Sequence, residues 1–429
     1  MRSRRAGDAL QQASRGRVSA KPGADRRRDA QAGSLLTGPA PAVEPAEYAA
    51  RRDAVAHGMR ALGLDAICVF YPARITYLTG FHFLPTERPV AAVIDREGAF
   101  TLVVPAVEKE HAESVPAAEV EVYFEYPGEK PPMRWVMGRL QRLGVAPERT
   151  GADHDGAIEY WGYRGPTLTG LLGTRPVDVE PVIEALRRVK SPREIECMAF
   201  SSDWAGRAHR RMQDAIRPGR TEMECYQPAA AESLREILRE VPGWRPRRFG
   251  GGLVCSFVGG KKTAMPHGFV RGQGLQAGDV LVSGAGLDVD GYSAELERTM
   301  VIGEPSAEQR KAFDAMVGLQ DRAFETMRPG VRIGEVELEV LAEASGLGYA
   351  ARLRHHVGHS VGLEVHEAPF LDRGETDPLE PGMVFTVEPG IYLPDLGGFR
   401  HSDTVVVTDT GCRLLTDYPR DLDSLVIPA

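Results

Sequence analysis

Residues 354–370 read RHHVGHSVGLEVHEAPF, and four of the protein's eleven histidines stand in this stretch. Glycines before and after His359 permit close backbone approach, and His366 follows seven residues later. If the segment is extended around a turn, both imidazoles face one cavity. A single histidine is usually structural, but a cluster of them favours a functional site. The histidines near strand-like and turn-like segments of the C-terminal half are His267, His355, His356, His359 and His366.

Acidic residues recur in the same half of the chain. Glu295 and Glu297 stand in SAELERT, Glu388 in TVEPG and Asp403 in RHSD. Side chains alternate along a strand, so Glu295 and Glu297 point to the same face. If that face is buried, two like charges must share a proton or meet a cation. Alternation with Leu296 is also the pattern of a solvated strand face, which stays open as the alternative.

The composition limits the class of protein. A chain of 429 residues, 42% hydrophobic and 26% charged, predicts two folded domains and possible tails. The net charge of −8 gives no basic face for nucleic acid. No apolar run approaches the roughly 18 to 20 residues of a membrane span, so we expect no membrane partner. The five cysteines form no CxxC pair, which predicts a cytoplasmic location and argues against a zinc-thiolate site.

The N-terminal part divides into a tail and a domain. Residues 1–45 are rich in Arg, Ala, Gly and Pro and predict a disordered basic tail. Residues 46–180 alternate between helix and strand patterns and predict a first domain. The expected elements are a helix over 46–63, a buried strand over 64–70, a hairpin over 89–105 with DREG as its turn, and a helix over 132–144.

Residues 181–429 predict a second domain, in which amphipathic helices precede strand-like segments. One helix begins after Ser191-Pro192 and another spans 308–327, and each ends at an RPG tripeptide, which suggests an internal repeat. A shorter helix is expected over 334–345. The segments LEPGMVFTVEPGIYL (379–393) and GFRHSDTVVVT (398–408) read as strands. The predicted class is therefore α/β, or α+β.

Motifs for other chemistries are missing from the sequence. It contains no nucleophile elbow, phosphate-binding loop or dinucleotide fingerprint. Cys255 and Ser256 lie near His267 in sequence and keep a nucleophilic mechanism open as a minor alternative.

Residues 46–425 resemble the creatinase and Xaa-Pro peptidase superfamily, peptidase family M24. The resemblance rests on GHSVGLEVHE (358–367), on the two strand-like segments quoted above, and on the junction RRVKSPREIECM (187–198). It implies a small creatinase-type N-terminal α/β domain followed by a C-terminal domain with the pita-bread fold. It also implies a homodimer.

The metallopeptidase branch of this superfamily binds two metal ions through Asp, Asp, His, Glu and Glu. The resemblance places His359 at the third ligand and Glu388 at the fourth. It places Gly284 at the first, Glu295 at the second and Ser402 at the fifth. Since two carboxylates are lost, we expect the paired metal site to be degenerate and the enzyme to need no cofactor.

The metal-free branch, creatinase, offers a different role for these residues. GYSAELERT (291–299) resembles its GYxxALERT segment, and GGFRHSD (397–403) its GGYREHD segment. The resemblance implies that His267 transfers the proton while Glu297 and Glu388 bind a cationic substrate group. Substrate binding would fall to Glu295, His359 and His366, and to Arg88 in TERP (86–89), which would bind a substrate carboxylate at the neighbouring subunit's site.

The sequence thus predicts a metal-independent, creatinase-like hydrolase of a nonpeptide C–N bond in a small guanidino, ureido or amidine-like carboxylate compound. Two departures weaken the match: Glu295 replaces an alanine, and VHEAPF keeps the peptidase form. An Xaa-Pro dipeptidase or aminopeptidase therefore remains as an alternative, with a divalent metal such as Mn, Co or Zn on Glu295, His359 and Glu388, and with Asp288 as a further donor. A noncatalytic small-molecule binding protein is the other alternative.

Overall fold

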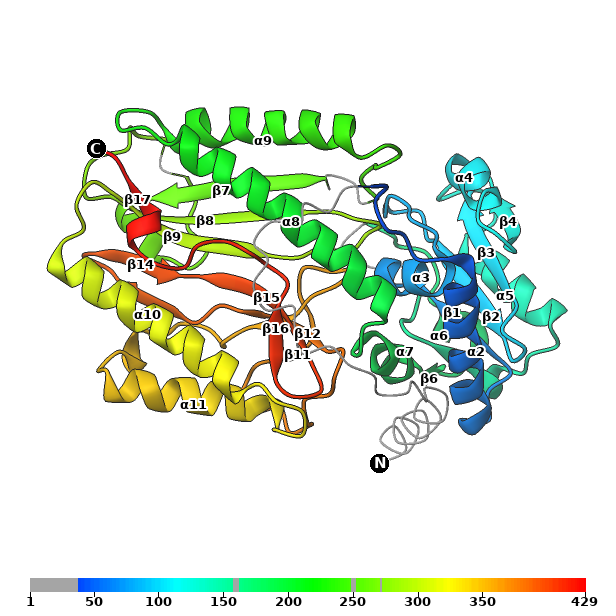
Figure 1. Cartoon of the computed structure of the whole chain (residues 1–429). Coiled ribbons are helices and arrows are strands. Elements are labelled where there is room, and N and C mark those ends of the chain that lie inside the picture. The colour runs from blue at the N-terminus through cyan, green and yellow to red at the C-terminus, as the bar shows by residue number, and fades with distance from the viewer. Residues whose placement is uncertain (1–37, 157–161, 248–251, 271) are drawn as a thin grey trace. The chain divides into compact units, whose positions relative to one another are not determined.

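The computed structural model describes residues 38–156, 162–247, 252–270 and 272–429. These residues divide into two compact units, Val43–Arg187 and Arg188–Ala429, and residues 38–42 belong to the second (Figure 1). Most of the predicted basic tail, residues 1–37, lies outside the described residues. The first unit ends seven residues after the predicted boundary, because the last helix, α7 (Glu180–Arg187), is tied into it. Arg74 binds Glu180 at 2.6 Å and Glu184 at 2.7 Å.

The N-terminal unit contains a six-stranded mixed sheet in the order β4-β3-β2-β1-β5-β6. The predicted hairpin is confirmed, since β2 and β3 pair antiparallel around DREG. β1 is buried along its whole length, as expected for a strand with both faces covered. The strands are β1 (Ala66–Val69), β2 (Ala91–Asp95), β3 (Phe100–Pro105), β4 (Glu119–Tyr123), β5 (Thr150–Ala152) and β6 (Val177–Asp178).

Helices of this unit follow the predicted amphipathic patterns. The helix expected over 46–63 is α2, and the one expected over 132–144 is α5, whose Met133, Val136 and Leu140 pack into the core formed with the sheet. These three side chains are spaced three and four residues apart and therefore lie on the same face of the helix. The helices are α2 (Pro45–Ala61), α3 (Pro72–Thr79), α4 (Lys109–Glu113), α5 (Met133–Arg142), α6 (Leu168–Leu172) and α7.

The C-terminal unit contains a nine-stranded sheet and a separate β13-β14 hairpin. The main path of the large sheet runs β11-β10-β12-β15-β9-β8-β7, while β16 pairs with β15 and β17 with β9. Figure 1 shows α8 and α9 along the β7-β8 half, and α10 and α11 beside the other half. The strands are β7 (Leu253–Gly259), β8 (Val280–Leu287), β9 (Leu296–Ile302), β10 (His359–Ser360), β11 (Glu367–Phe370), β12 (Val384–Val387), β13 (Gly390–Leu393), β14 (Gly397–Arg400), β15 (Ser402–Val407), β16 (Cys412–Leu414) and β17 (Val426–Ile427).

Four helices cover this sheet: α8 (Pro192–Ala215), α9 (Glu222–Glu240), α10 (Ala307–Thr326) and α11 (Ile333–Gly346). Capping boxes start α8, α9 and α10, so three otherwise unpaired helix ends are satisfied locally. Each RPG tripeptide connects two packed helices, and its glycine takes a left-handed φ of 82° at Gly219 and 86° at Gly330. Glycine reaches this conformation without strain. The internal repeat itself stays a prediction.

Packing in the core of the C-terminal unit fixes the direction in which the two acids beside Leu296 point. Leu296 is fully buried in this core, so its neighbours Glu295 and Glu297 point to the opposite face of the strand. Within the described residues, no helix is both long enough and apolar enough to cross a membrane. All five cysteines are free.

Candidate functional site

Six strand-borne residues of the C-terminal unit form one polar cluster. Glu295 directly precedes β9, which carries Glu297; His359 opens β10; Glu388 follows β12; Arg400 ends β14; and Ser402 opens β15. The predicted common face of Glu295 and Glu297 is confirmed, and both lie within electrostatic reach of Glu388. Because Glu297 exposes only 14% of its side chain and Glu295 is half-buried, the alternative of a solvated strand face is wrong.

Glu295, His359 and Glu388 bring three potential metal-ligand atoms within 4.8 Å of one another. Two carboxylate oxygens and an imidazole nitrogen are donors that suit Mn, Co or Zn. Ser402 Oγ donates to Glu295 Oε1 at 2.7 Å and orients that carboxylate. The three side chains come from segments far apart in sequence, which the sheet brings together.

The orientation of His359 tests whether these residues fit a cation. Its Nδ1 lies 3.0 Å from the Ser360 carbonyl oxygen and therefore carries the proton as donor. Its Nε2 lies 3.2 Å from Glu388 Oε1 without the alignment of a hydrogen bond. This buried nitrogen makes no aligned hydrogen bond among the described residues, but Glu388 outweighs burial and raises the pKa of His359, so without a metal the imidazole and this carboxylate form an ion pair. A divalent cation between the three donors would satisfy this nitrogen, so the residues fit a metal.

Electrostatics also favour a cation beside Glu295. Burial raises the pKa of Glu295 to about 8, and the charges of Glu388 and Glu297 act in the same direction. Burial acts the same way on Glu388, but contact with His359 and the charge of Arg400 outweigh it and lower the pKa of Glu388 to about 2. The pKa values of neighbouring acids in this cluster therefore differ strongly, and such perturbed pKa values are typical of functional sites.

Arg400 forms a bidentate ion pair with Glu297. Its Nε lies 2.5 Å from Glu297 Oε2, and its Nη2 lies 2.7 Å from Oε1. Nη1 donates to Tyr392 Oη at 3.2 Å and to the Pro266 carbonyl at 3.3 Å. Burial opposes the charged form, but Glu297 and Tyr392 raise the pKa of Arg400 well above its ordinary value.

The remaining histidines lie around this cluster. His366 is exposed and stacks on His359, with ring centroids 3.9 Å apart. His267 is also exposed and lies close enough to His366 to contribute to the lowered pKa of that ring, for which burial is the main cause. His355 contacts Tyr392 Oη through Nε2 at 2.7 Å. His267 is thus at the rim of the site, and the described contacts do not link it to Glu297 or Glu388.

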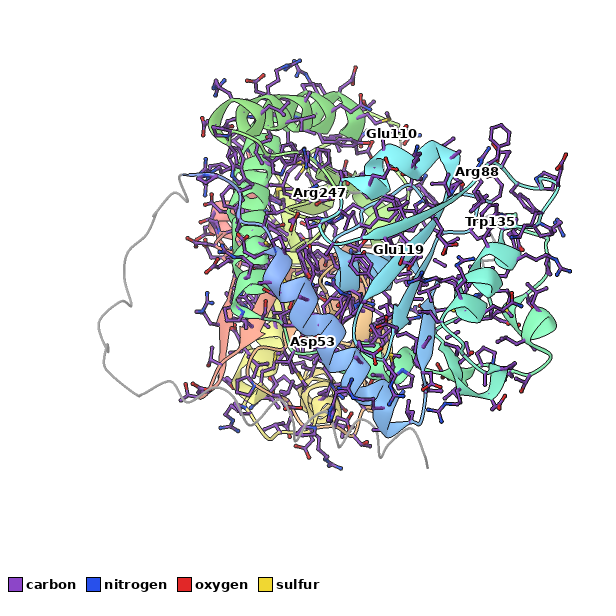
Figure 2. All side chains as sticks on the ribbon, turned by 90° about the vertical axis from the view of Figure 1, so that its right-hand side faces the viewer. Asp53, Arg88, Glu110, Glu119, Trp135 and Arg247 are labelled. Carbon is purple, nitrogen blue, oxygen red and sulfur yellow. The ribbon has the colours of Figure 1, made fainter. Side chains whose placement is uncertain are left out.

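Arg88 belongs to the N-terminal unit, where Figure 2 labels it. Its guanidinium binds Glu125 at 2.5 Å through Nε and Glu87 at 2.5 Å through Nη1. Both contacts occupy the donors that a substrate carboxylate would use. Its predicted role in substrate binding stays a prediction.

Three other residues considered from the sequence make contacts that stabilise the fold and lie outside the proposed ligand cluster. Asp288 accepts from Gly291 N at 2.7 Å and stabilises the β8-β9 turn, outside the ligand cluster. Asp403 is fully buried and binds Arg298 at 2.8 Å. Cys255 is buried against the Ala208 carbonyl, and burial raises the pKa of its thiol to about 12, so it is no candidate nucleophile.

Sequence reasoning gave no role to Arg400, Tyr392 or Lys190. Lys190 is buried, donates to Ser360 Oγ and Glu367 Oε2, both at 2.9 Å, and so holds the segment that carries His359. A usable signal existed for Arg400, because a buried acid pair requires a cation and this arginine stands two residues before Ser402.

Comparison with known proteins indicates the family of this chain. Residues 196–409 match the model of metallopeptidase family M24, and residues 51–189 match the creatinase/prolidase N-terminal domain. The probable dipeptidase PepE of Mycobacterium tuberculosis is 32% identical over 398 residues, which cover 89% of this chain and 98% of that protein. The chain belongs to the metallopeptidase family M24.

Two further proteins are similar to it. The Xaa-Pro dipeptidase of Pyrococcus furiosus is 33% identical over 244 residues, covering 57% of this chain and 67% of that protein. The crystal structure of dipeptidase PepE from Mycobacterium ulcerans has a TM-score of 0.77 and 29% identity, and the match covers 90% of this chain and all of that one. The predicted superfamily, the two-domain fold and the hydrolase class are confirmed.

The prediction of a metal-independent, creatinase-like hydrolase of a nonpeptide C–N bond is wrong. The similar proteins are named dipeptidases and Xaa-Pro dipeptidases, and the matched family is one of metallopeptidases. The prediction of no cofactor is wrong for the same reason. The replacements at Gly284 and Ser402 suggested the loss of all metal binding, but the donors of Glu295, His359 and Glu388 still converge.

Proposed function

We propose that this chain is a metal-dependent peptidase that hydrolyses dipeptides, with Xaa-Pro dipeptides as the substrate class. The observation behind the proposal is the convergence of Glu295, His359 and Glu388, whose potential ligand atoms all lie within 4.8 Å of one another. The names of the similar proteins support the substrate class. The predicted homodimer and cytoplasmic location stay predictions.

Glu295, His359 and Glu388 would hold one divalent ion. Such an ion polarises a scissile carbonyl and makes water more acidic at neutral pH. The protein's own residues prepare the site for it: Ser402 orients Glu295, and the Ser360 carbonyl fixes the tautomer of His359. The exposed ring of His366 stacks on His359 and offers a hydrogen bond to a bound peptide.

An assay of the untagged protein loaded with Mn²⁺ tests the proposal. We expect hydrolysis of Ala-Pro that stops with a chelator and returns with Mn²⁺. His359→Ala should lower turnover at least about 100-fold, because one of three ligands is lost. His356→Ala is the matched control, since its ring contacts His359 from outside the cluster and its loss should leave turnover within a few fold.

Two results would revise the proposal. Hydrolysis of Ala-Ala but not Ala-Pro would keep a dipeptidase and contradict the Xaa-Pro substrate class. Chelator-resistant turnover, or turnover that His359→Ala leaves unchanged, would overturn the metal-dependent mechanism.

A further inference from the structure

Three residues in register form a row across three neighbouring strands. Ser402 of β15 pairs with Glu297 of β9, which pairs on its other side with Gly284 of β8. A Cβ atom at Gly284 would lie 3.7 Å from Glu297 Oε1, so the Glu297 carboxylate extends over the glycine. The two outer positions have no carboxylate, and the central position carries one.

Arg400 supplies a fixed positive charge to this row. Both oxygens of Glu297 bind its guanidinium, while Tyr392 Oη and the Pro266 carbonyl occupy the remaining terminal nitrogen. Arg400 Nε also lies 3.8 Å from Glu388 Oε2, so the guanidinium stands between two acids of the cluster. With only 12% of the side chain exposed, the guanidinium is held in place from several sides.

The charges of the cluster then match one divalent ion. Glu295, Glu297 and Glu388 provide three negative charges when ionised, and Arg400 neutralises one of them. Two negative charges remain, which a single divalent cation balances. A second divalent ion would add two uncompensated positive charges in a largely buried site, next to the guanidinium, and would be strongly disfavoured.

We propose that the site binds one divalent ion, on Glu295, His359 and Glu388, and that the Arg400–Glu297 ion pair takes the place of a second ion. The inference rests on the proposed metal-dependent function and specifies its cation arrangement. The enzyme would thus use two cations: one exchangeable divalent metal ion and the guanidinium of Arg400, which is part of the polypeptide.

A cavity beside the ion pair provides room to test this arrangement. It has a volume of about 160 Å³ and is lined by Gly284, Glu297, Tyr392 and Arg400, with Val282 and Met265 among the apolar residues. Because a Cβ atom at Gly284 makes only ordinary contacts, a side chain can start there without a backbone shift and point toward this space. The carboxylate missing at Gly284 can therefore be tested by substitution, together with the one missing at Ser402.

The experiment counts Mn²⁺ ions per chain by elemental mass spectrometry after loading and desalting, and records the Mn²⁺ electron paramagnetic resonance spectrum. The wild-type protein should retain one ion per chain, with the six-line signal of an isolated ion. The variant G284D/S402E/E297Q/R400M should retain two ions with a broadened, spin-coupled signal. Its cluster has four carboxylates and no guanidinium, so two divalent ions balance its charge.

A smaller variant is the matched control. E297Q/R400M removes the ion pair without adding ligands and should still retain one ion, because Glu295, His359 and Glu388 remain. Thermal unfolding checks that each variant is folded. If the fourfold variant does not fold, the wild-type count and spectrum decide the question alone.

The outcomes separate this inference from the proposed function. Two coupled ions in the wild-type protein would overturn the inference and leave the metal-dependent function standing. No retained ion at any loading concentration would overturn the proposed function itself. One isolated ion supports both.

Discussion

Glu297 of β9 binds the guanidinium of Arg400 with both carboxylate oxygens, at 2.5 and 2.7 Å, in a site where each side chain is nearly buried. Bidentate pairing fixes the orientation of both groups as well as their charge. The acids of this protein therefore have an internal cation, and the cluster tolerates three carboxylates close together. Removing that cation should have a larger effect than removing a surface charge.

Arg400→Met is expected to lower the free energy of unfolding of the metal-free protein by about 3–5 kcal/mol, because it leaves Glu297 charged and unpaired in a buried site. Arg400→Met/Glu297→Gln should recover most of that loss. Urea unfolding in the presence of a chelator measures both values. Arg193→Met is the control, since it breaks an exposed pair with Glu196 and should cost less than about 1 kcal/mol. Equal costs for Arg193→Met and Arg400→Met would show that the buried pair has no special role.

The backbone before His359 leaves no room for a side chain. A Cβ atom at Gly358 would lie 2.0 Å from the Thr386 carbonyl oxygen, which is backbone of β12 and does not move easily. Gly358→Ala should therefore displace β10, lower the melting temperature by several degrees and abolish Mn²⁺ retention. Gly318→Ala is the matched control, because Gly318 lies within α10 and a Cβ atom there would meet open space. This substitution should stabilise the protein by about 0.5–1 kcal/mol. Normal Mn²⁺ retention by Gly358→Ala would contradict the requirement for this close strand contact.

Ligands and orienting residues should differ in their effect on metal affinity. Glu388→Gln removes a charged donor of the cluster and should weaken Mn²⁺ binding by more than about 100-fold. Ser402→Ala removes only the hydrogen bond to Glu295 and should weaken it by about 10-fold, in the range typical of residues that orient a ligand. Isothermal titration calorimetry with Mn²⁺ measures both. A loss for Ser402→Ala as large as that for Glu388→Gln would mean that the serine itself is a ligand.

Much of the fold was accessible from the sequence because local patterns determined it. Amphipathic spacing located α2, α5, α8 and α10, and DREG located the hairpin between β2 and β3. Helix α9 was missed: Pro228 interrupts its pattern, although the capping box at Thr221 and Glu224 starts it. The motifs located the acids and His359 but not their partners.

The partners depend on tertiary structure. Arg400 contacts Glu297, which is 103 residues away in the sequence, and Tyr392 contacts His355, which is 37 residues away. No local pattern specifies such pairs. Each replaced ligand taken alone predicts a site without metal, whereas the three-dimensional arrangement keeps three donors together and adds a guanidinium. The number of cations is thus a property of the folded cluster.

A buried histidine away from this cluster predicts acid sensitivity of the fold. His209 of α8 is fully buried, with Nε2 2.6 Å from Ser283 Oγ and its ring 4.4 Å from that of Tyr418. Burial, helped by the charges of Arg298 and Arg210, lowers the pKa of His209 to about 3. The folded protein therefore keeps this ring neutral at pH values where the unfolded chain, with an ordinary histidine pKa near 6.5, binds a proton.

This difference fixes the sign and the pH range of the effect. The unfolded state binds more protons between pH 6.5 and about 3, so stability contributed by His209 is complete above pH 6.5 and is lost as the pH falls. The slope should approach 1.4 kcal/mol per pH unit within that range. Urea unfolding from pH 8 to pH 4.5 should show a steeper loss for the wild-type protein than for His209→Gln, which has no proton to bind. His57→Gln is the control, because His57 is exposed on α2. This variant should keep the wild-type dependence of the free energy of unfolding on pH. Parallel curves for the wild-type protein and His209→Gln would show that His209 does not resist protonation in the folded state.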